Sequence, residues 1–258
     1  MFKNEFQNVV NASKAKLAFL EKNPLGYLLS SGLAGIYVGI GIILIFTVGG
    51  LLSGLPYAKI LMGISFGIAL SLVIMAGSEL FTGNNLVMTA GSLSKEVPWA
   101  KTVKVWIVCY IGNWLGSAIL AVLYNFSGLN KGPVAEFIAS TTLAKTTAPI
   151  SELFIRAMLC NILVCLAVWC SIKLQSEAGK LIMVFWCLFA FITSGFEHSV
   201  ANMTLLTIGL LNPMDQAITV AGYLTNIIVV SLGNMAGAIL FVALPYYVMQ
   251  REKLVNNK

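Results

Sequence analysis

Charge is scarce in this chain. Of its 258 residues only 10% are charged, while 58% are hydrophobic, a balance that no water-soluble globular domain of this length needs. The shortage of charge argues against a soluble protein and makes the lipid bilayer the expected solvent. The net charge of +6 does not indicate a nucleic-acid partner, because the basic residues do not cluster on a soluble domain.

Histidine is rarer still, since His198 is the only one in the chain. The five cysteines fall inside apolar stretches at spacings that match no metal or redox motif, and we interpret them as small buried hydrophobic residues. A zinc site would need several of these scattered thiols to converge. We therefore expect no metal and no cofactor.

The hydrophobic residues gather in runs long enough to cross a bilayer, which takes about 20 residues as a helix. Six runs cover residues 28–52, 60–93, 105–126, 153–172, 181–211 and 223–249. We predict an all-α membrane protein with a single domain, residues 1–258, in which residues 25–258 form six transmembrane spans around a pore.

Residues 1–24 form a polar segment that precedes the first apolar run and does not resemble a cleavable signal peptide. Its apolar residues recur at helical spacing, which predicts an amphipathic helix that lies on the membrane surface or packs between subunits. These residues are Phe2, Phe6, Val9, Val10, Leu17 and Leu20.

The loops differ in basic charge. Alternate assignment places 12 of the 16 Lys and Arg residues on one side, namely Lys3, Lys14, Lys16, Lys22, Lys95, Lys101, Lys104, Lys173, Lys180, Arg251, Lys253 and Lys258. Because cytoplasmic loops carry the excess of Lys and Arg, we expect a plasma (inner) membrane protein with both termini in the cytoplasm. Lys59, Lys131, Lys145 and Arg156 fall on the outer side.

The two halves of the chain are related. The string at residues 112–120 recurs at 233–240 with an offset of 121, and in spans two and five a Glu and an Asn recur with an offset of 118: Glu79 with Asn84, and Glu197 with Asn202. An odd number of spans per repeat forces opposite orientations. We therefore predict two inverted three-helix repeats, a plan in which interrupted helices meet at the substrate path. The glycines of the repeated strings also suit packing faces.

Polar residues interrupt spans two and five at residues 77–85 and 193–202. Neither stretch suits lipid as a plain helix, and ionisable residues at this depth usually mark pathways. We expect capping of one half-helix by Asn84 and Asn85, and of the other by Ser199 and Asn202. The half-helix N-termini would then direct partial positive charge at the centre of the protein, which favours an anion.

The polar side chains at the interruptions have different expected roles. Glu79 and Glu197 should hold the breaks in shape by accepting hydrogen bonds from loop amides, because a carboxylate repels an anion. His198 favours a pore role, and Thr82 could reach it through its hydroxyl and fix its tautomer. Lys145, taken alone, is typical of a solvated loop lysine.

The motifs at residues 79–84 and 194–202, Glu-Leu-Phe-Thr-Gly-Asn and Ser-Gly-Phe-Glu-His-Ser-Val-Ala-Asn, resemble the signatures of the formate/nitrite transporter family. The resemblance covers nearly the whole chain, including residues 161–169. It implies an aquaporin-like protomer that assembles as a homopentamer with one pore per subunit. It also implies passage of formate, nitrite or hydrosulfide, with the hydrosulfide-channel branch the most similar.

The resemblance assigns a role to each candidate pore residue. It implies that His198 is the central histidine, Thr82 its partner, Lys145 an electropositive pore lysine, Glu197 the acid beside the histidine and Asn161 a pore-facing asparagine. Apolar constrictions above and below the histidine are implied at Phe66, Leu70, Leu80, Phe81 and Phe191.

These residues suggest a mechanism. An anion drawn in by Lys145 and the half-helix ends would share a proton with His198 and cross the apolar constriction as the neutral acid, since a bare charge is costly there. An intramembrane hydrolase using Ser194 or Ser199 with His198 is the alternative, although no nucleophile-elbow pattern surrounds either serine. A gating role of the N-terminal segment stays open.

Overall fold

A computed structural model describes residues 2–250. Met1 and residues 251–258 lie outside the described part, and so do Arg251, Lys253 and Lys258 of the topology count. The elements are α1 Lys3–Lys22, α2 Pro24–Leu51, α3 Ala58–Ser65, α4 Gly67–Met75, α5 Phe81–Leu93, α6 Trp99–Phe126, α7 Gly132–Thr146, α8 Ile150–Lys173, α9 Glu177–Ser194, α10 Ser199–Leu211, α11 Val220–Ala238, the π-helical turn η1 Ile239–Ala243 and α12 Leu244–Gln250.

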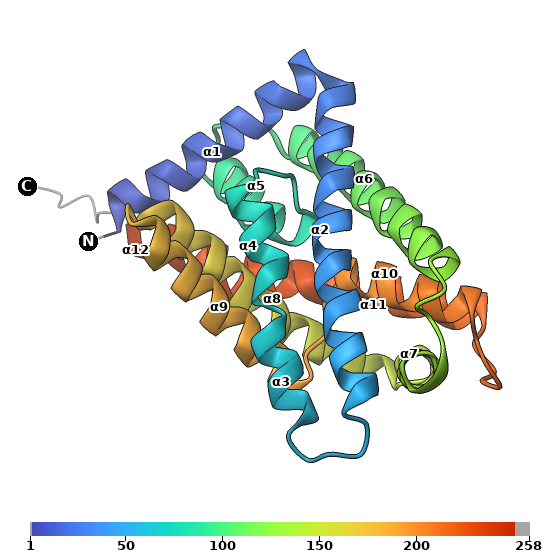
Figure 1. Ribbon diagram of the computed structural model, residues 1–258. Coiled ribbons are helices and arrows are strands. Elements are labelled where there is room, and N and C mark those ends of the chain that lie inside the picture. The colour runs from blue at the N-terminus through green and yellow to red at the C-terminus, as the bar shows by residue number, and fades with distance from the viewer. Residues whose placement is uncertain (1, 251–258) are drawn as a thin grey trace, which may run out of the picture.

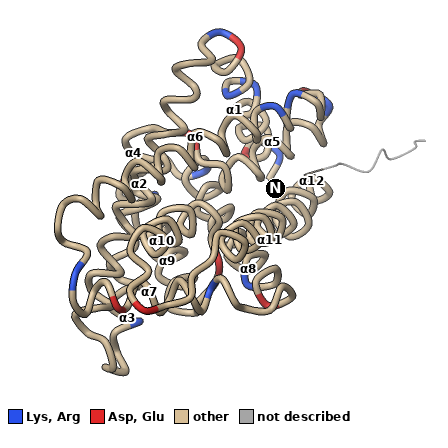
Figure 2. The backbone as a smooth tube through the Cα atoms, turned by 90° about the vertical axis from the view of Figure 1, so that its right-hand side faces the viewer, with Lys and Arg blue, Asp and Glu red and all other residues tan. Residues whose placement is uncertain are grey.

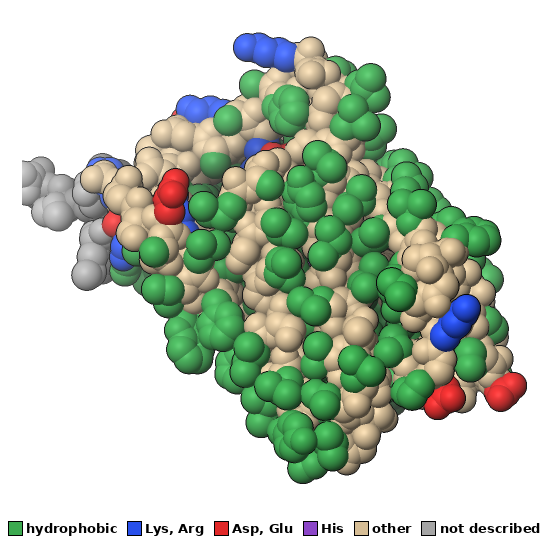
Figure 3. All heavy atoms as spheres, in the orientation of Figure 1, with side chains coloured by type: hydrophobic (Ala, Val, Ile, Leu, Met, Phe, Trp, Pro, Cys, Tyr) green, Lys and Arg blue, Asp and Glu red, His purple; other side chains and the backbone are tan. Residues whose placement is uncertain are grey.

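Within residues 2–250, six helical segments are long and apolar enough to span a membrane, by length and composition. They are α2, α3 with α4, α6, α8, α9, and α11 with η1 and α12, in agreement with the six predicted spans. Figure 2 shows the charged residues gathered toward two ends of the molecule, and in Figure 3 hydrophobic side chains cover most of the face between them. On α2, for example, Leu29, Leu33, Ile40 and Leu44 are exposed. An apolar belt on the protein surface is expected where lipid and not water surrounds the protein.

Helix α1 runs diagonally from beside α12 to the start of α2 (Figure 1). Its apolar face packs against its own chain, where Phe6, Val9 and Val10 join Leu86 of α5 and Trp169 of α8 in one buried cluster. The predicted amphipathic helix is therefore present. The apolar face that was expected to meet lipid or another subunit is buried within the protomer.

Helix α7 differs from the sequence expectation, in which Lys145 lay in a loop. Lys145 lies in the last turn of α7. The reason is a stripe of buried residues at helical spacing, including Val134, Ile138 and Thr142, which packs this helix against α2 and α10. The helix is too short to span the membrane and was hidden by its many small and polar residues.

The repeated glycines bring two pairs of helices into close contact. A Cβ atom on Gly116 of α6 would overlap the carbonyl oxygen of Gly32 on α2, and one on Gly237 of α11 would overlap the carbonyl oxygen of Met158 on α8. The two repeats thus use the same small-residue packing, one between α2 and α6 and the other between α8 and α11.

We predict that Gly116→Ala destabilises the protein by about 1–3 kcal/mol, the usual cost of overpacking, because its methyl group would meet fixed backbone. Gly32→Ala on the facing helix is the matched control, since its Cβ would lie 3.8 Å from the nearest atom, the carbonyl oxygen of Gly112. Thermal unfolding of the detergent-solubilised protein compares the two. Equal unfolding temperatures would contradict the close approach.

Candidate functional site

The two helix interruptions share one backbone plan. Gly77 after α4 and Gly195 at the end of α9 both have positive φ, +76° and +80°, a conformation that glycine adopts without strain. After each glycine the chain turns back, with Ser78 N–H donating to Val73 O and Phe196 N–H donating to Phe191 O, both at 3.0 Å. The half-helices α5 and α10 then begin at Phe81 and Ser199.

Two asparagines from neighbouring helices cap these half-helices. Asn113 Oδ1 on α6 accepts the Phe81 N–H at 2.9 Å, and Asn234 Oδ1 on α11 accepts the Ser199 N–H at 2.9 Å. Each asparagine also donates to the carbonyl oxygen of the preceding glutamate, Glu79 at 2.8 Å or Glu197 at 2.9 Å. Both are fully buried.

The predicted caps Asn84, Asn85, Ser199 and Asn202 are wrong, because all four lie within the helices they were expected to cap. The asparagines of the repeated Gly-Asn strings cap the half-helices instead, although they lie 32 and 35 residues farther along the chain. Sequence reasoning treated those strings as packing faces and missed their side chains. The repetition of Gly-Asn in both halves is the signal that could have found them.

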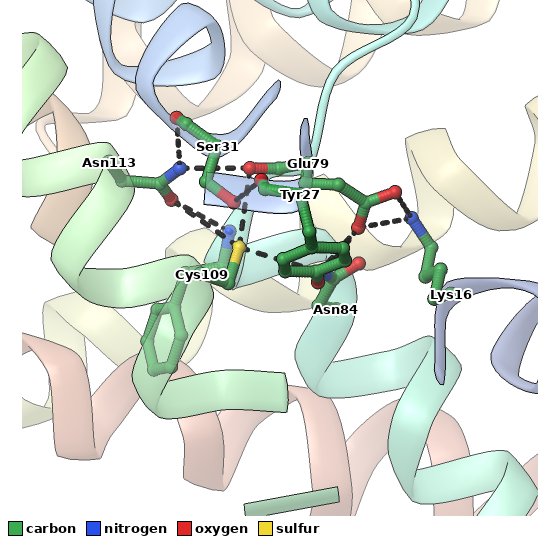
Figure 4. A network of polar contacts seen from close by, with 8 residues as sticks. Lys16, Tyr27, Ser31, Glu79, Asn84, Cys109 and Asn113 are labelled. Atoms are coloured by element: carbon green, nitrogen blue, oxygen red, sulfur yellow. Dashed lines mark hydrogen bonds and ion pairs between the residues drawn. The ribbon is translucent and has the colours of Figure 1, made fainter. Parts of the chain in front are cut away.

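Glu79 is held by side chains and not by the expected loop amides (Figure 4). Lys16 Nζ of α1 donates to both carboxylate oxygens at 2.8 Å. The Tyr27 hydroxyl and Asn84 Nδ2 donate to Oε2 at 3.1 and 2.9 Å. The network ties α1, α2 and α5 to the first break. Lys16 and Tyr27 were not singled out from the sequence, and no local pattern marks them.

Glu197 has the corresponding arrangement in the second break. Lys145 Nζ of α7 donates to both of its oxygens at 2.7 Å, and Asn202 Nδ2 donates to Oε2 at 2.7 Å. Asn226 accepts from Asn202 and donates to the Lys145 carbonyl. The structure thus brings Lys145 and Glu197 together, as an ion pair in which the carboxylate balances the ammonium charge.

His198 is the N-cap residue of α10 and is 5% exposed. Its Nδ1 accepts the Ala201 N–H at 3.1 Å, and its Nε2 lies 3.0 Å from Thr82 Oγ1, so the expected contact between the two breaks is present. Because Nδ1 uses its lone pair for the cap, the neutral ring carries its proton on Nε2. The ring stacks on Phe191 with centroids 5.9 Å apart.

Three cavities lie in series along the protein. We name two of them the outer and the inner vestibule after the topology that the sequence predicts. The outer vestibule, about 490 Å³, is lined by Lys145, Glu197, Phe191 and His198 among others. The inner vestibule, about 430 Å³, is lined by Lys16, Glu79, Leu70 and Leu80 among others. Between them lies a central chamber of about 10 Å³, lined by Val38, Phe66, Ala69, Leu70, Leu80, Val164, Leu188, Phe191 and His198.

The chamber connects the vestibules through shared walls. Phe191 and His198 also line the outer vestibule, and Leu70 and Leu80 also line the inner one. Of the described residues that line the chamber, His198 alone is polar. Phe66 narrows it by an edge-to-face contact with Phe191, with centroids 5.4 Å apart. Its volume is enough for roughly one water molecule.

Three expected pore residues, Thr82, Phe81 and Asn161, line none of the three cavities. Phe81 packs on Tyr110 with centroids 4.9 Å apart and lines an apolar surface groove with Trp106 and Met235. Asn161 is fully buried and lines none of the three cavities. Its Nδ2 donates to Thr82 O, Asn85 Oδ1 and Asn234 O, so it joins the two breaks.

The serines considered for hydrolysis are not paired with the histidine. Both ring nitrogens of His198 are engaged, by Thr82 and Ala201, and the Ser199 hydroxyl has no partner among the described residues. Ser194 is exposed at the end of α9. Within residues 2–250 no group of three or more His, Cys, Asp or Glu side chains could hold a metal ion.

Comparison with known proteins gives consistent matches over nearly the whole chain. A family model described as "Formate/nitrite transporter" matches residues 3–248. The nitrite transporter NirC of Salmonella typhimurium is 45% identical over 252 residues, which cover 94% of this chain and 91% of that protein.

Two solved structures are also similar. An "FNT family ion channel" superimposes with a TM-score of 0.93 at 41% identity and covers 97% of this chain and 100% of the other. A "Pentameric formate channel with formate bound" gives 0.78 at 27% identity and covers 89% and 98%. The relatives are named as transporters and channels, which supports transport and not catalysis.

We predict that Asn234→Ala lowers stability by about 2–4 kcal/mol, because it removes the partner of the Ser199 N–H and of the Glu197 carbonyl at the buried second break. Ser199→Ala is the matched control, and its effect should be small because the hydroxyl that it removes is unpartnered. Thermal unfolding measures both variants. A larger effect of Ser199→Ala would restore the local capping hypothesis.

Proposed function

This chain belongs to the formate/nitrite transporter family, and we propose that it conducts small monovalent anions of weak acids across the membrane through a pore within each subunit. The observation that carries this proposal is the single polar ring of His198 in an apolar chamber between two vestibules. A dry constriction rejects hydrated ions, and one hydrogen-bond donor inside it selects a small acceptor.

The anion would enter the outer vestibule, pass Phe191 and His198, cross the chamber, and leave between Leu70 and Leu80 into the inner vestibule. Lys145 would attract it, since two of the three ammonium N–H groups are taken by Glu197 and one is left to donate. The half-helix starts at α5 and α10 add partial positive charge.

The geometry sharpens the role of His198. While Nδ1 holds the Ala201 N–H, the ring offers the Nε2 proton as a hydrogen-bond donor. An anion that displaces the Thr82 hydroxyl would accept that proton in a hydrogen bond. We propose that proton sharing takes this form, which lets the anion pass the chamber with its charge dispersed and without a second proton on the ring.

Nitrite is the first substrate to test and formate the second. The relative at 45% identity is named a nitrite transporter, and a structural relative at 27% identity holds formate. Hydrosulfide stays a prediction from the sequence motifs. Flux of the three anions, measured side by side in proteoliposomes, separates them.

We further propose that the protein is a homopentamer, because a structural relative is a pentamer. We also propose that it lies in the plasma (inner) membrane. By the positive-inside rule the end that carries α1 and the α8–α9 connection would face the cytoplasm. Both termini would then be cytoplasmic and the vestibule at α7 would open outside.

We expect His198→Asn to lower anion flux about 10-fold or more, since a hydrogen bond to a charged group is worth about 1.5–3 kcal/mol. Asparagine is a good N-cap residue, so the fold should survive. Flux in proteoliposomes from pH 5 to 8 tests this. A wild-type rate in the variant across this pH range would exclude the proton-sharing step.

Leu80→Ala should widen the chamber and admit larger anions, so that permeability to acetate rises relative to formate. Phe81→Ala is the control from the adjacent position, because Phe81 lies outside the chamber. The measured quantity is the acetate-to-formate permeability ratio. If Phe81→Ala changes this ratio more than Leu80→Ala does, the assigned path is wrong.

A further inference from the structure

The two vestibules differ in the charges that line them. The outer vestibule is lined by Lys59, Lys145, Arg156 and Glu197, and the inner vestibule by Lys16 and Glu79. Each contains one partly buried ion pair, Lys145 with Glu197 or Lys16 with Glu79. The outer vestibule therefore carries two additional cations.

These two cations are not equivalent. Arg156 forms an exposed ion pair with Glu152, which lies outside the vestibule lining. Lys59 is exposed and has no carboxylate within ion-pair distance among the described residues. Of the cations that line either vestibule, Lys59 is the one whose charge is not balanced within the described part of the chain.

The inverted repeat shows that Lys59 and Arg156 have no charged counterparts in the inner vestibule. The offset of 118 residues that relates Glu79 to Glu197 relates Lys59 to Glu177, which does not line the inner vestibule. The carbonyl of Arg156 accepts the Glu197 N–H at 3.3 Å, and the carbonyl of Ser30 accepts the Glu79 N–H at 3.4 Å. Serine thus occupies the place of arginine on the inner side.

Lys59 also lies directly at the second break. Its Nζ is 2.9 Å from the position that a Cβ on Gly195 would occupy, and Gly195 is the C-cap residue of α9, two residues before Glu197. The ammonium group therefore stands beside the chain segment that leads to His198. An anion approaching His198 from the outer vestibule would pass it.

We propose that Lys59 is an anion-capture residue of the outer vestibule and makes anion capture asymmetric, with a lower half-saturating concentration on the outer side. This inference rests on the proposed function. Charges beyond about 8–10 Å are largely screened at physiological salt, so the lining charges determine capture. One free charge at contact distance should change the half-saturating concentration about threefold.

The test is the Lys59→Cys variant in proteoliposomes, with nitrite flux measured before and after a membrane-impermeant thiol reagent is applied from the outer side. We expect the half-saturating concentration to rise about threefold in the variant. A cationic ethylammonium reagent should restore it, and an anionic ethylsulfonate reagent should raise it further. Nitrite added from the inner side should show no such change.

Lys131→Cys is the matched control, because Lys131 is an exposed lysine of the same end that does not line the vestibule. The wild-type protein, treated with the same reagents, controls for its five native cysteines. Equal effects of the cationic and anionic reagents on Lys59→Cys, or none, would overturn the inference. Absence of nitrite, formate and hydrosulfide flux in the wild type would instead overturn the proposed function.

Discussion

The backbone of two helix interruptions must find hydrogen-bond partners where lipid supplies none, and the rest of the structure depends on how it does so. One buried asparagine supplies hydrogen-bond partners to each interruption. Asn113 accepts the first N–H of α5 and donates to the carbonyls of Ser31 and Glu79, so a single amide satisfies one donor and two acceptors. Asn234 does the same for the second break. With these ends fixed, the half-helices can start inside the protein and the vestibules can form on either side of them.

The shared plan makes the difference between the halves informative. The 118-residue offset relates His198 to Leu80, and both line the chamber from the N-cap positions of their half-helices. Leucine contributes only bulk there. Histidine can cap its helix through Nδ1 and still present Nε2 toward Thr82, because the two ring nitrogens point in different directions. One substitution between equivalent positions thus turns a symmetric apolar constriction into a site with a single donor.

Features that appear as a pattern in the sequence itself could be predicted from it. Features that depend on contacts between residues distant in the sequence could not. The six spans, the two breaks and the inverted repeat follow from hydropathy and self-similarity, so their positions agreed with the structure. Capping was assigned to nearby Asn84 and Ser199 because a local pattern cannot show that another helix supplies the partner. The Lys16–Glu79 pair joins residues 63 positions apart, which no spacing rule reveals. Phe81 was predicted to form a pore constriction. It is buried, but its side chain lines the surface groove and not the chamber.

The two carboxylates beside an anion path have a physical role once their partners are known. An unpaired lysine in a partly dehydrated vestibule would hold an anion strongly, and conduction requires that binding be weak enough for release. Glu197 neutralises Lys145 yet leaves one of its N–H groups free to donate. Exposed Lys59 can remain unpaired because water screens it. In the proposed function, attraction by full charge would therefore act at the mouth and would give way deeper in the vestibule to hydrogen bonding, first from Lys145 and then from His198. The anion would then meet no site from which it cannot leave.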